Sequence, residues 1–270
     1  MNSVRQPAVA GSFYPGQAAA LAHEVSTLLA EVPSHIGSAG PVPKALIVPH
    51  AGYIYSGATA ALAYARLAPA RHSIRRVVLL GPAHRVPVRG LALPDDDALA
   101  TPLGQVEMDR AAVAQLAQLP QVVVSRSVHA HEHALEVQLP FLQTVLDDFQ
   151  LVPLVVGHAG AEDVAEVLEL LWGGPETLLV VSSDLSHFLP YRAAQQADSQ
   201  TMQAILRLDG PLSQQQACGG TSINGLLLAA RHHGLQPRLL GMCNSGDTAG
   251  DMARVVGYAA VAFMEVDHAN

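Results

Sequence analysis

Short, almost wholly apolar runs that recur along the chain are the feature that most constrains its fold. Three of them occupy residues 45–48, 77–80 and 178–181. Each is rich in Val, Leu or Ile and is followed closely by turn residues, which is typical of a strand buried on both faces of a sheet. Because helices must then cover both faces, the runs predict an α/β protein.

Segments with helical apolar spacing alternate with these runs. The expected helices are 18–29, 58–67, 109–119, 131–146, 162–172, 192–206 and 221–232. Further strands are expected at 90–93, 122–125, 151–156, 238–242 and 255–264. Asp109 and Thr221 are the expected N-caps, and Pro140 predicts a kink or break near residue 139. The short loop between the last two strands favours a central mixed β-sheet flanked by helices.

Composition narrows the class of protein. No linker or repeat divides the 270 residues, so we expect a single domain over 1–270. The net charge is −8 and basic residues are scattered, which argues against nucleic-acid binding. No apolar run is long enough to span a membrane and the first residues do not resemble a signal peptide, so cytoplasmic residence is expected. Two cysteines are too few for a disulfide framework.

A histidine follows each of the three apolar runs. His50, His84 and His187 would all lie just beyond the carboxyl end of a strand, at the edge where open α/β sheets bind ligands. Neutral imidazole is a common ligand of Zn, Fe, Cu and Ni. His50 and His84 are therefore candidate metal ligands. The alternative for these two is a pair of loop histidines that bond to the backbone.

Cys218 is a third candidate because it comes just before the expected helix 221–232. A helix N-terminus lowers the pKa of a thiol, which favours the thiolate needed for a metal bond or for nucleophilic attack. The alternative is a small buried apolar residue. Asp184 and His187 are three residues apart, so His187 is a candidate acid or base and Asp184 its orienting partner. Alternatively, Asp184 is a helix N-cap and His187 a surface residue.

The densest group of histidines and glutamates lies at 129–136. It lacks the His-Glu-x-x-His order of a zincin. We interpret Glu132 and His133 as candidate residues of the pocket, and His129 and His131 as peripheral. The Gly-rich segment 244–251 is interpreted as a tight structural connection, because its aspartates oppose phosphate binding.

With these residues in place, the chain resembles the Memo family, which includes the bacterial proteins called AmmeMemoRadiSam system protein B. The matching segments follow one another along nearly the whole chain, at 5–15, 48–57, 80–84, 132–140, 182–187, 217–219, 244–247 and 256–258.

The resemblance implies a fold similar to class III extradiol dioxygenases. It also implies that His50, His84 and Cys218 hold a metal, with iron (Fe²⁺) first and copper or zinc as alternatives, while Asp184 and His187 line the same pocket. Those dioxygenases use two His and a carboxylate, whereas here a Cys stands in the third position. A thiolate favours softer metals, so dioxygenase activity does not carry over with the fold.

Three functions stay open. The first is a metal-binding redox protein in which Glu132, His133, Asp184 and His187 shape the pocket around an unknown substrate. The second is a peptide- or partner-binding module with a vestigial metal site, since some members of the family resemble phosphotyrosine-peptide binders. The third is a hydrolase with Cys218 as nucleophile. The resemblance also suggests a radical-SAM protein and an AMMECR1-like protein as partners.

Overall fold

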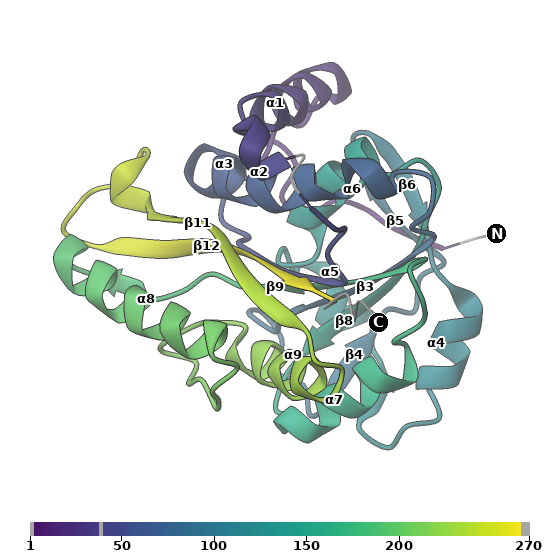
Figure 1. Cartoon of the computed structure of the whole chain (residues 1–270). Helices are drawn as coiled ribbons and strands as arrows, with labels where there is room; N and C mark the ends of the chain where they lie inside the picture. The colour runs from purple at the N-terminus through teal and green to yellow at the C-terminus, as the bar shows by residue number, and fades with distance from the viewer. Residues whose placement is uncertain (1–2, 38–39, 266–270) are drawn as a thin grey trace.

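Four parallel strands form the middle of the main sheet. The computed structural model, which describes residues 3–37 and 40–265, places them in the order β2, β9, β3, β8 (Figure 1). They span Ala45–Val48 (β2), Thr177–Ser182 (β9), Arg76–Pro82 (β3) and Gln150–Val156 (β8). All four are buried almost throughout, as expected of continuous runs of Val, Leu and Ile. The apolar runs therefore predicted the centre of the sheet.

Other strands extend the sheet on both sides and make it mixed. They are β4 (Leu91–Leu93), β7 (Val122–Val124), β10 (His187–Leu189), β11 (Gln236–Asn244) and β12 (Val255–Met264). β12 pairs antiparallel with β2, β10 and β11. On the other side, β4 is antiparallel to β8 and parallel to β7. The prediction of a mixed α/β sheet is confirmed.

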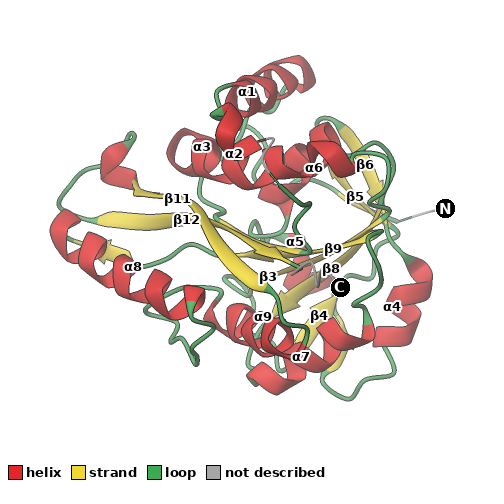
Figure 2. Cartoon of the chain, in the orientation of Figure 1, coloured by secondary structure: helices red, strands yellow, loops and turns green. Residues whose placement is uncertain are grey.

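Helices cover both faces of this sheet (Figure 2). The α-helices are α1 (Ala18–Ala30), α2 (Ser34–Gly37), α3 (Tyr53–Tyr64), α4 (Arg110–Leu116), α5 (Arg126–Ala130), α6 (Leu139–Val145), α7 (Ala161–Leu170), α8 (Tyr191–Leu206) and α9 (Gly220–His232). The 3-10 turns are η1 (Ala65–Ala70), η2 (Glu136–Gln138) and η3 (Ser245–Asp247). α1, α3 and α6 pack on one face, whereas α7, α8 and α9 pack on the other (Figure 1). Alternate residues of each strand enter the two cores, so both faces are apolar.

Three expectations about the helices need correction. Residues 131–146 are not one helix: α5 ends at Ala130 and α6 begins at Leu139, so the expected break near residue 139 is real but larger than a kink. Pro140 lies in the first turn of α6, where its missing N–H costs no hydrogen bond. Thr221 is not an N-cap, because α9 begins at Gly220. Asp109 does cap α4, through a hydrogen bond from the Ala112 N–H.

The third correction concerns α3, which begins at Tyr53 rather than at residue 58. Gly57 therefore lies inside the helix instead of in a loop. A Cβ at this position would come within 2.9 Å of the Leu28 side chain of α1. The glycine thus allows α1 to pack closely on α3, and its helix-breaking tendency is overridden by that packing.

A small second sheet had no counterpart in the prediction. It joins β1 (Val4–Arg5), β5 (Ala98–Thr101) and β6 (Gly104–Glu107). These strands are only two to four residues long, and most of β6 is exposed. Such segments carry too few apolar residues for their periodicity to be recognised. Among the helices of the described residues, none is long and apolar enough to cross a membrane.

Candidate functional site

The carboxyl ends of the parallel strands gather the candidate residues at one edge of the sheet. β2 pairs with β9 so that Val48 lies opposite Ser182, and β3 pairs with the other side of β9. His50 follows β2, Asp184 follows β9 and His84 follows β3. Side chains that are far apart in the sequence are thereby brought together, as strand-end positions in a parallel sheet predict.

The ring of His50 is buried and its orientation is fixed by Ser182. Its Nδ1 lies 2.8 Å from the Ser182 Oγ, which donates its only proton to the Ala134 carbonyl at 2.7 Å. The Gln138 side-chain amide also donates to the Ser182 Oγ, at 2.8 Å. Because the Ser182 proton is already engaged, we infer that His50 Nδ1 carries a proton and donates it. The lone pair is then left on Nε2.

Glu132 orients His84 in a similar way. One carboxylate oxygen lies 2.9 Å from the His84 Nδ1, and the other accepts from the His84 backbone N–H at 2.7 Å. Burial raises the pKa of Glu132, but the hydrogen bond and charge of His84 and the backbone donors outweigh it, so that the pKa falls to about 2. An ionised carboxylate only accepts, so His84 donates from Nδ1, and Nε2 is the nitrogen that carries the lone pair when the imidazole is neutral.

His133 lies against both of these rings. Its centroid is 4.8 Å from that of His84, in a stacked arrangement, and 5.5 Å from that of His50. The ring of Phe13 packs against it at 4.8 Å. Its Nδ1 is buried and has no hydrogen-bond partner among the described residues. Burial, together with the charge of His50, lowers the pKa of His133 to about 4, so the imidazole is neutral at pH 7.

Cys218 completes the group from the loop before α9. Its Sγ lies 3.3 Å from the His50 Nε2 and accepts from the Asp184 N–H at 3.3 Å. The next residue, Gly219, allows this approach, because a Cβ there would come within 2.7 Å of the Ser183 side chain. The loop thus presses the sulfur against the ends of β2 and β9.

Burial controls the charges of this group. Burial, followed by the charge of His84, lowers the pKa of His50 to about 3. Burial and the Asp184 carboxyl raise the pKa of the Cys218 thiol to about 12. Burial also raises the pKa of Asp184 above its ordinary value, although its Oδ1 accepts from the His50 N–H. Without a metal, His50 and Cys218 are therefore a neutral imidazole and a neutral thiol.

The donor set fits a metal ion. One nitrogen from each of His50, His84 and His133 lies within 4.8 Å of the other two. The Cys218 sulfur approaches the same His50 Nε2 to 3.3 Å. Nitrogen and sulfur ligands of one tetrahedral ion are about 3.6 Å apart. Imidazole nitrogens at this spacing, with a sulfur beside one of them, are ligands that transition metals bind. The protein therefore has residues that could hold such an ion.

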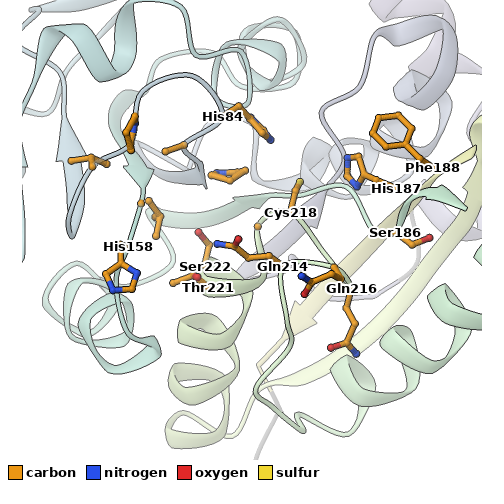
Figure 3. A pocket seen from close by; sticks show the side chains of 18 of the residues that line it. His84, His158, Ser186, His187, Phe188, Gln214, Gln216, Cys218, Thr221 and Ser222 are labelled. Carbon is orange, nitrogen blue, oxygen red and sulfur yellow. The ribbon is translucent and has the colours of Figure 1, made fainter.

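A cavity of about 870 Å³ opens beside this group. Figure 3 shows Cys218 between His84 and His187, which line the cavity together with His158. His187 donates from Nδ1 to the Leu185 carbonyl at 2.9 Å, so its Nε2 has the lone pair. His50, His133, Asp184 and Glu132 are not among the lining residues, and all but His133 are buried.

Both apolar and polar residues line the cavity. The apolar residues include Pro82, Pro87, Val88 and Phe188, and the polar ones are Gln214, Gln215, Gln216, Thr221, Ser186 and Ser222. None of the described residues that line it is a Lys, Arg, Asp or Glu. The hydroxyl of Ser222 is buried without a hydrogen-bond partner in the described part of the chain. The cavity is thus shaped for an uncharged, partly apolar molecule that can hydrogen-bond.

Sequence reasoning missed several residues that build the site. Ser182 and Gln138 lie inside two segments of the family resemblance, but nothing in the sequence predicts their contacts with the site, and residues 214–216 carry no signal at all. Phe188 was also missed, although its position next to His187 could have suggested it. Its φ is +59°, which an aromatic residue rarely adopts, and its side chain is 59% exposed at the cavity. His129 is buried apart from the cluster and donates to the Ala92 carbonyl, so its role is structural.

Comparisons with known proteins agree over nearly the full length. The sequence profile of the family described as "Memo-like protein" matches residues 5–262. A "MEMO1 family protein" of Aeropyrum pernix is 36% identical over 96% of this chain and 99% of its own length. Relatives with the same name from Methanosarcina barkeri and Aquifex aeolicus are 37% and 34% identical, over 96% and 97% of this chain and 99% of their own lengths.

Similarity to solved structures is more distant. An uncharacterised protein of Escherichia coli K12 is 14% identical, with a TM-score of 0.48. The match covers 82% of this chain and 99% of that one.

Proposed function

Because this chain belongs to the Memo family and gathers three imidazoles and a thiol beside a cavity, we propose that it is a metal-binding redox protein. In this proposal His50, His84 and Cys218 are the ligands and Fe(II) is the metal, with copper or zinc as alternatives. The observation that carries the proposal is the cluster of His50, His84 and His133, each of which offers a nitrogen within 4.8 Å of the other two, with the Cys218 sulfur 3.3 Å from the His50 Nε2. His133 is a further imidazole in reach of the same point.

Bound iron would supply one-electron chemistry at the wall of the cavity, and a thiolate ligand favours softer metals. The protein contributes the rest. Ser182 and Glu132 hold the rings of His50 and His84 so that their lone pairs meet, which is the orienting role of groups behind metal ligands. The Cys218 thiol loses its proton when it binds, since the ligand is the thiolate.

His187 is the proposed acid or base. Its Nδ1 is engaged by the Leu185 carbonyl, so proton transfer falls to Nε2 on the cavity side of the ring. Asp184 supports the site from behind by accepting the His50 N–H. His133 and Glu132 shape the pocket in the same way, since both are in contact with His84.

The lining of the cavity suggests the class of substrate. A neutral small molecule with an apolar part would find the apolar residues Pro87, Val88 and Phe188 and the amides of three glutamines in the lining. We also propose residence in the cytoplasm and, from the family, partnership with radical-SAM and AMMECR1-like proteins.

Metal content tests the ligand assignment. The protein is purified anaerobically with iron, and bound metals are measured in the wild type and in His50→Ala, His84→Ala and Cys218→Ser. We expect about one iron per chain in the wild type and a loss of about 10-fold or more in affinity in each variant. His158→Ala is the matched control, because His158 lines the cavity but lies outside the cluster.

Unchanged metal content in the His50 and Cys218 variants would refute the assignment. If only Cys218→Ser keeps its metal, the ligands are the three imidazoles, and His133→Ala then removes it. Reversible oxidation of the bound metal, followed by its absorption spectrum, tests the redox role separately.

The two alternatives find less support in the geometry. A nucleophilic Cys218 needs a thiolate, yet its pKa is raised to about 12 and that of His50 is lowered to about 3, so the pair carries no charge. A phosphopeptide is bound best by Arg or Lys, and the described lining of the cavity contains neither.

A further inference from the structure

A second group of metal-binding side chains lies where α7 and α9 end. Glu169 belongs to α7, His232 is the last residue of α9, and His233 follows it. One carboxylate oxygen of Glu169 is 2.9 Å from the His232 Nδ1, and the other is 2.8 Å from the His233 Nε2. One ligand atom from each residue lies within 4.8 Å of the other two.

The positions of these atoms suit a single ion. Ligands that bind one tetrahedral ion at about 2.1 Å are about 3.4 Å apart, so small side-chain rotations are needed. The two nitrogens that now donate to Glu169 must also pass their protons to the other nitrogen of each ring, which changes the tautomer and not the charge. The hydrogen bonds of His232 and His233 outweigh partial burial and keep the pKa of Glu169 below its ordinary value. The carboxylate is therefore ionised at neutral pH. All three side chains are open to solvent, with exposed fractions of 33%, 72% and 29% for Glu169, His232 and His233.

Packing beneath the group restricts its motion. The ring of His233 stacks on Trp172, with centroids 3.6 Å apart and planes 7° from parallel. Lys44 donates to the Trp172 carbonyl at 2.5 Å, and its ammonium lies 5.4 Å from the Trp172 ring. Below, a Cβ at Gly225 would clash with Val164 at 2.4 Å, so α7 and α9 are in close contact. A binding group whose parts are already held loses little entropy when it takes a ligand.

This group is separate from the cavity. α9 begins next to Cys218 and Gly219, which line the cavity, and it ends at His232. Its 13 residues span about 20 Å at the rise of an α-helix. The two clusters therefore lie at opposite ends of one helix.

We propose that Glu169, His232 and His233 form a second metal site, accessible from solvent, for a borderline divalent ion such as Zn²⁺ or Ni²⁺. Zn²⁺ and Ni²⁺ bind imidazole ligands well, whereas Mg²⁺ and Ca²⁺ prefer oxygen ligands, so two imidazoles and one carboxylate favour the former pair. Three protein ligands leave open positions that water fills.

The single tryptophan of the chain makes this site observable on its own. Ni²⁺ bound beside His233 would lie next to the Trp172 ring and quench its fluorescence, because a paramagnetic ion in close contact opens a non-radiative path. We expect saturable quenching by NiCl2 in the wild type and reversal by excess ZnCl2. Glu169→Gln and His232→Ala should weaken the apparent affinity by about 10-fold or more. His232 is exposed, so its removal leaves the fold intact.

Two controls separate this site from others. His84→Ala removes a candidate ligand of the cavity and should leave the quenching unchanged. His72→Ala removes another exposed histidine that pairs with a carboxylate, that of Asp147, and should also have no effect. Quenching that is absent in the wild type, or equal in the wild type and in Glu169→Gln and His232→Ala, overturns the proposal. A loss of quenching in His84→Ala alone would assign the signal to the cavity and also overturn it.

Discussion

Single side chains behind the cavity wall determine which nitrogen each histidine presents. Ser182 has one proton and three partners, and its proton goes to a carbonyl that can only accept. Glu132 is ionised and accepts from His84. In both cases the far side of the imidazole is left with the lone pair. The side chains that contact His50 and His84 thus decide which nitrogen each of these candidate ligands presents.

Ser182→Ala tests this at the level of one atom. The change removes the hydrogen-bond partner of the His50 Nδ1. It also removes one hydrogen bond from the buried Ala134 carbonyl and one from the Gln138 amide. We expect a loss of about 1–3 kcal/mol of unfolding free energy, measured in urea, and about 10- to 100-fold weaker metal binding. Ser73→Ala, which truncates an exposed serine bonded to a carbonyl, should change neither quantity. Full metal affinity in Ser182→Ala would show that His50 does not depend on this contact.

Among structural elements, the N-terminal strand is the one that fixes the loop carrying Glu132 and His133. Arg5 in β1 donates to Glu136 at 2.6 Å, to the Glu132 carbonyl at 2.6 Å and to the His129 carbonyl at 3.0 Å. Glu136 is fully buried and also accepts from Tyr14. A segment near the start of the chain thereby holds the irregular loop that replaces the expected helix.

Arg5→Ala should be costly for this reason. It leaves the buried Glu136 carboxylate without its cation, which typically costs about 3–5 kcal/mol of unfolding free energy. The control is Arg71→Ala, because the Arg71 side chain is 47% exposed and its ion pair with Asp147 is screened by water. Urea unfolding of both variants gives the comparison. Equal, small losses would mean that the carboxylate finds other donors or a proton.

The elements also show what the sequence could and could not predict. The sequence predicts strands at 45–48 and 255–264 with the bounds that the structure shows, because a buried strand is an unbroken apolar run. The start of α3 was missed because Gly57 resembles a loop residue until α1 is packed against it. Strand ends placed His50 and His84 at one edge. The tautomers and the contact between Cys218 and His50 depend on side chains 132 and 168 residues away, which no local pattern encodes.

At the scale of the whole molecule, buried histidines make stability depend on pH. The pKa is lowered from 6.5 to about 3 in His50 and to about 4 in His129 and in His133, in each case mainly by burial. Below about pH 6.5 these histidines bind protons in the unfolded chain but not in the folded protein. The unfolding free energy therefore decreases as pH falls. The effect reaches up to about 1.4 kcal/mol per pH unit for each histidine. The pKa of Glu132 is lowered from 4.5 to about 2, so this residue reduces the unfolding free energy further only below pH 4.5.

Urea unfolding of the chelator-treated protein between about pH 7.5 and about pH 5 measures this slope. We expect the unfolding free energy to fall steadily below about pH 6.5. His129→Gln retains a donor for the Ala92 carbonyl and cannot titrate. The slope of its unfolding free energy against pH should therefore correspond to about one proton fewer than in the wild type. A wild-type slope of zero over this range would show that these histidines titrate equally in both states.

The position of β12 in the sheet has a consequence for how the protein is made. This strand comes near the end of the chain, at Val255–Met264, yet it pairs with β2, whose other neighbour is β9. A chain emerging from the ribosome exposes His50 and His84 long before Cys218, and before the strand that covers the open edge of β2. The nascent chain thus presents a bare edge of β2 until β12 has been made. Metal loading at the cavity is therefore expected to follow the synthesis of Cys218 and β12 rather than to guide the early folding of the chain.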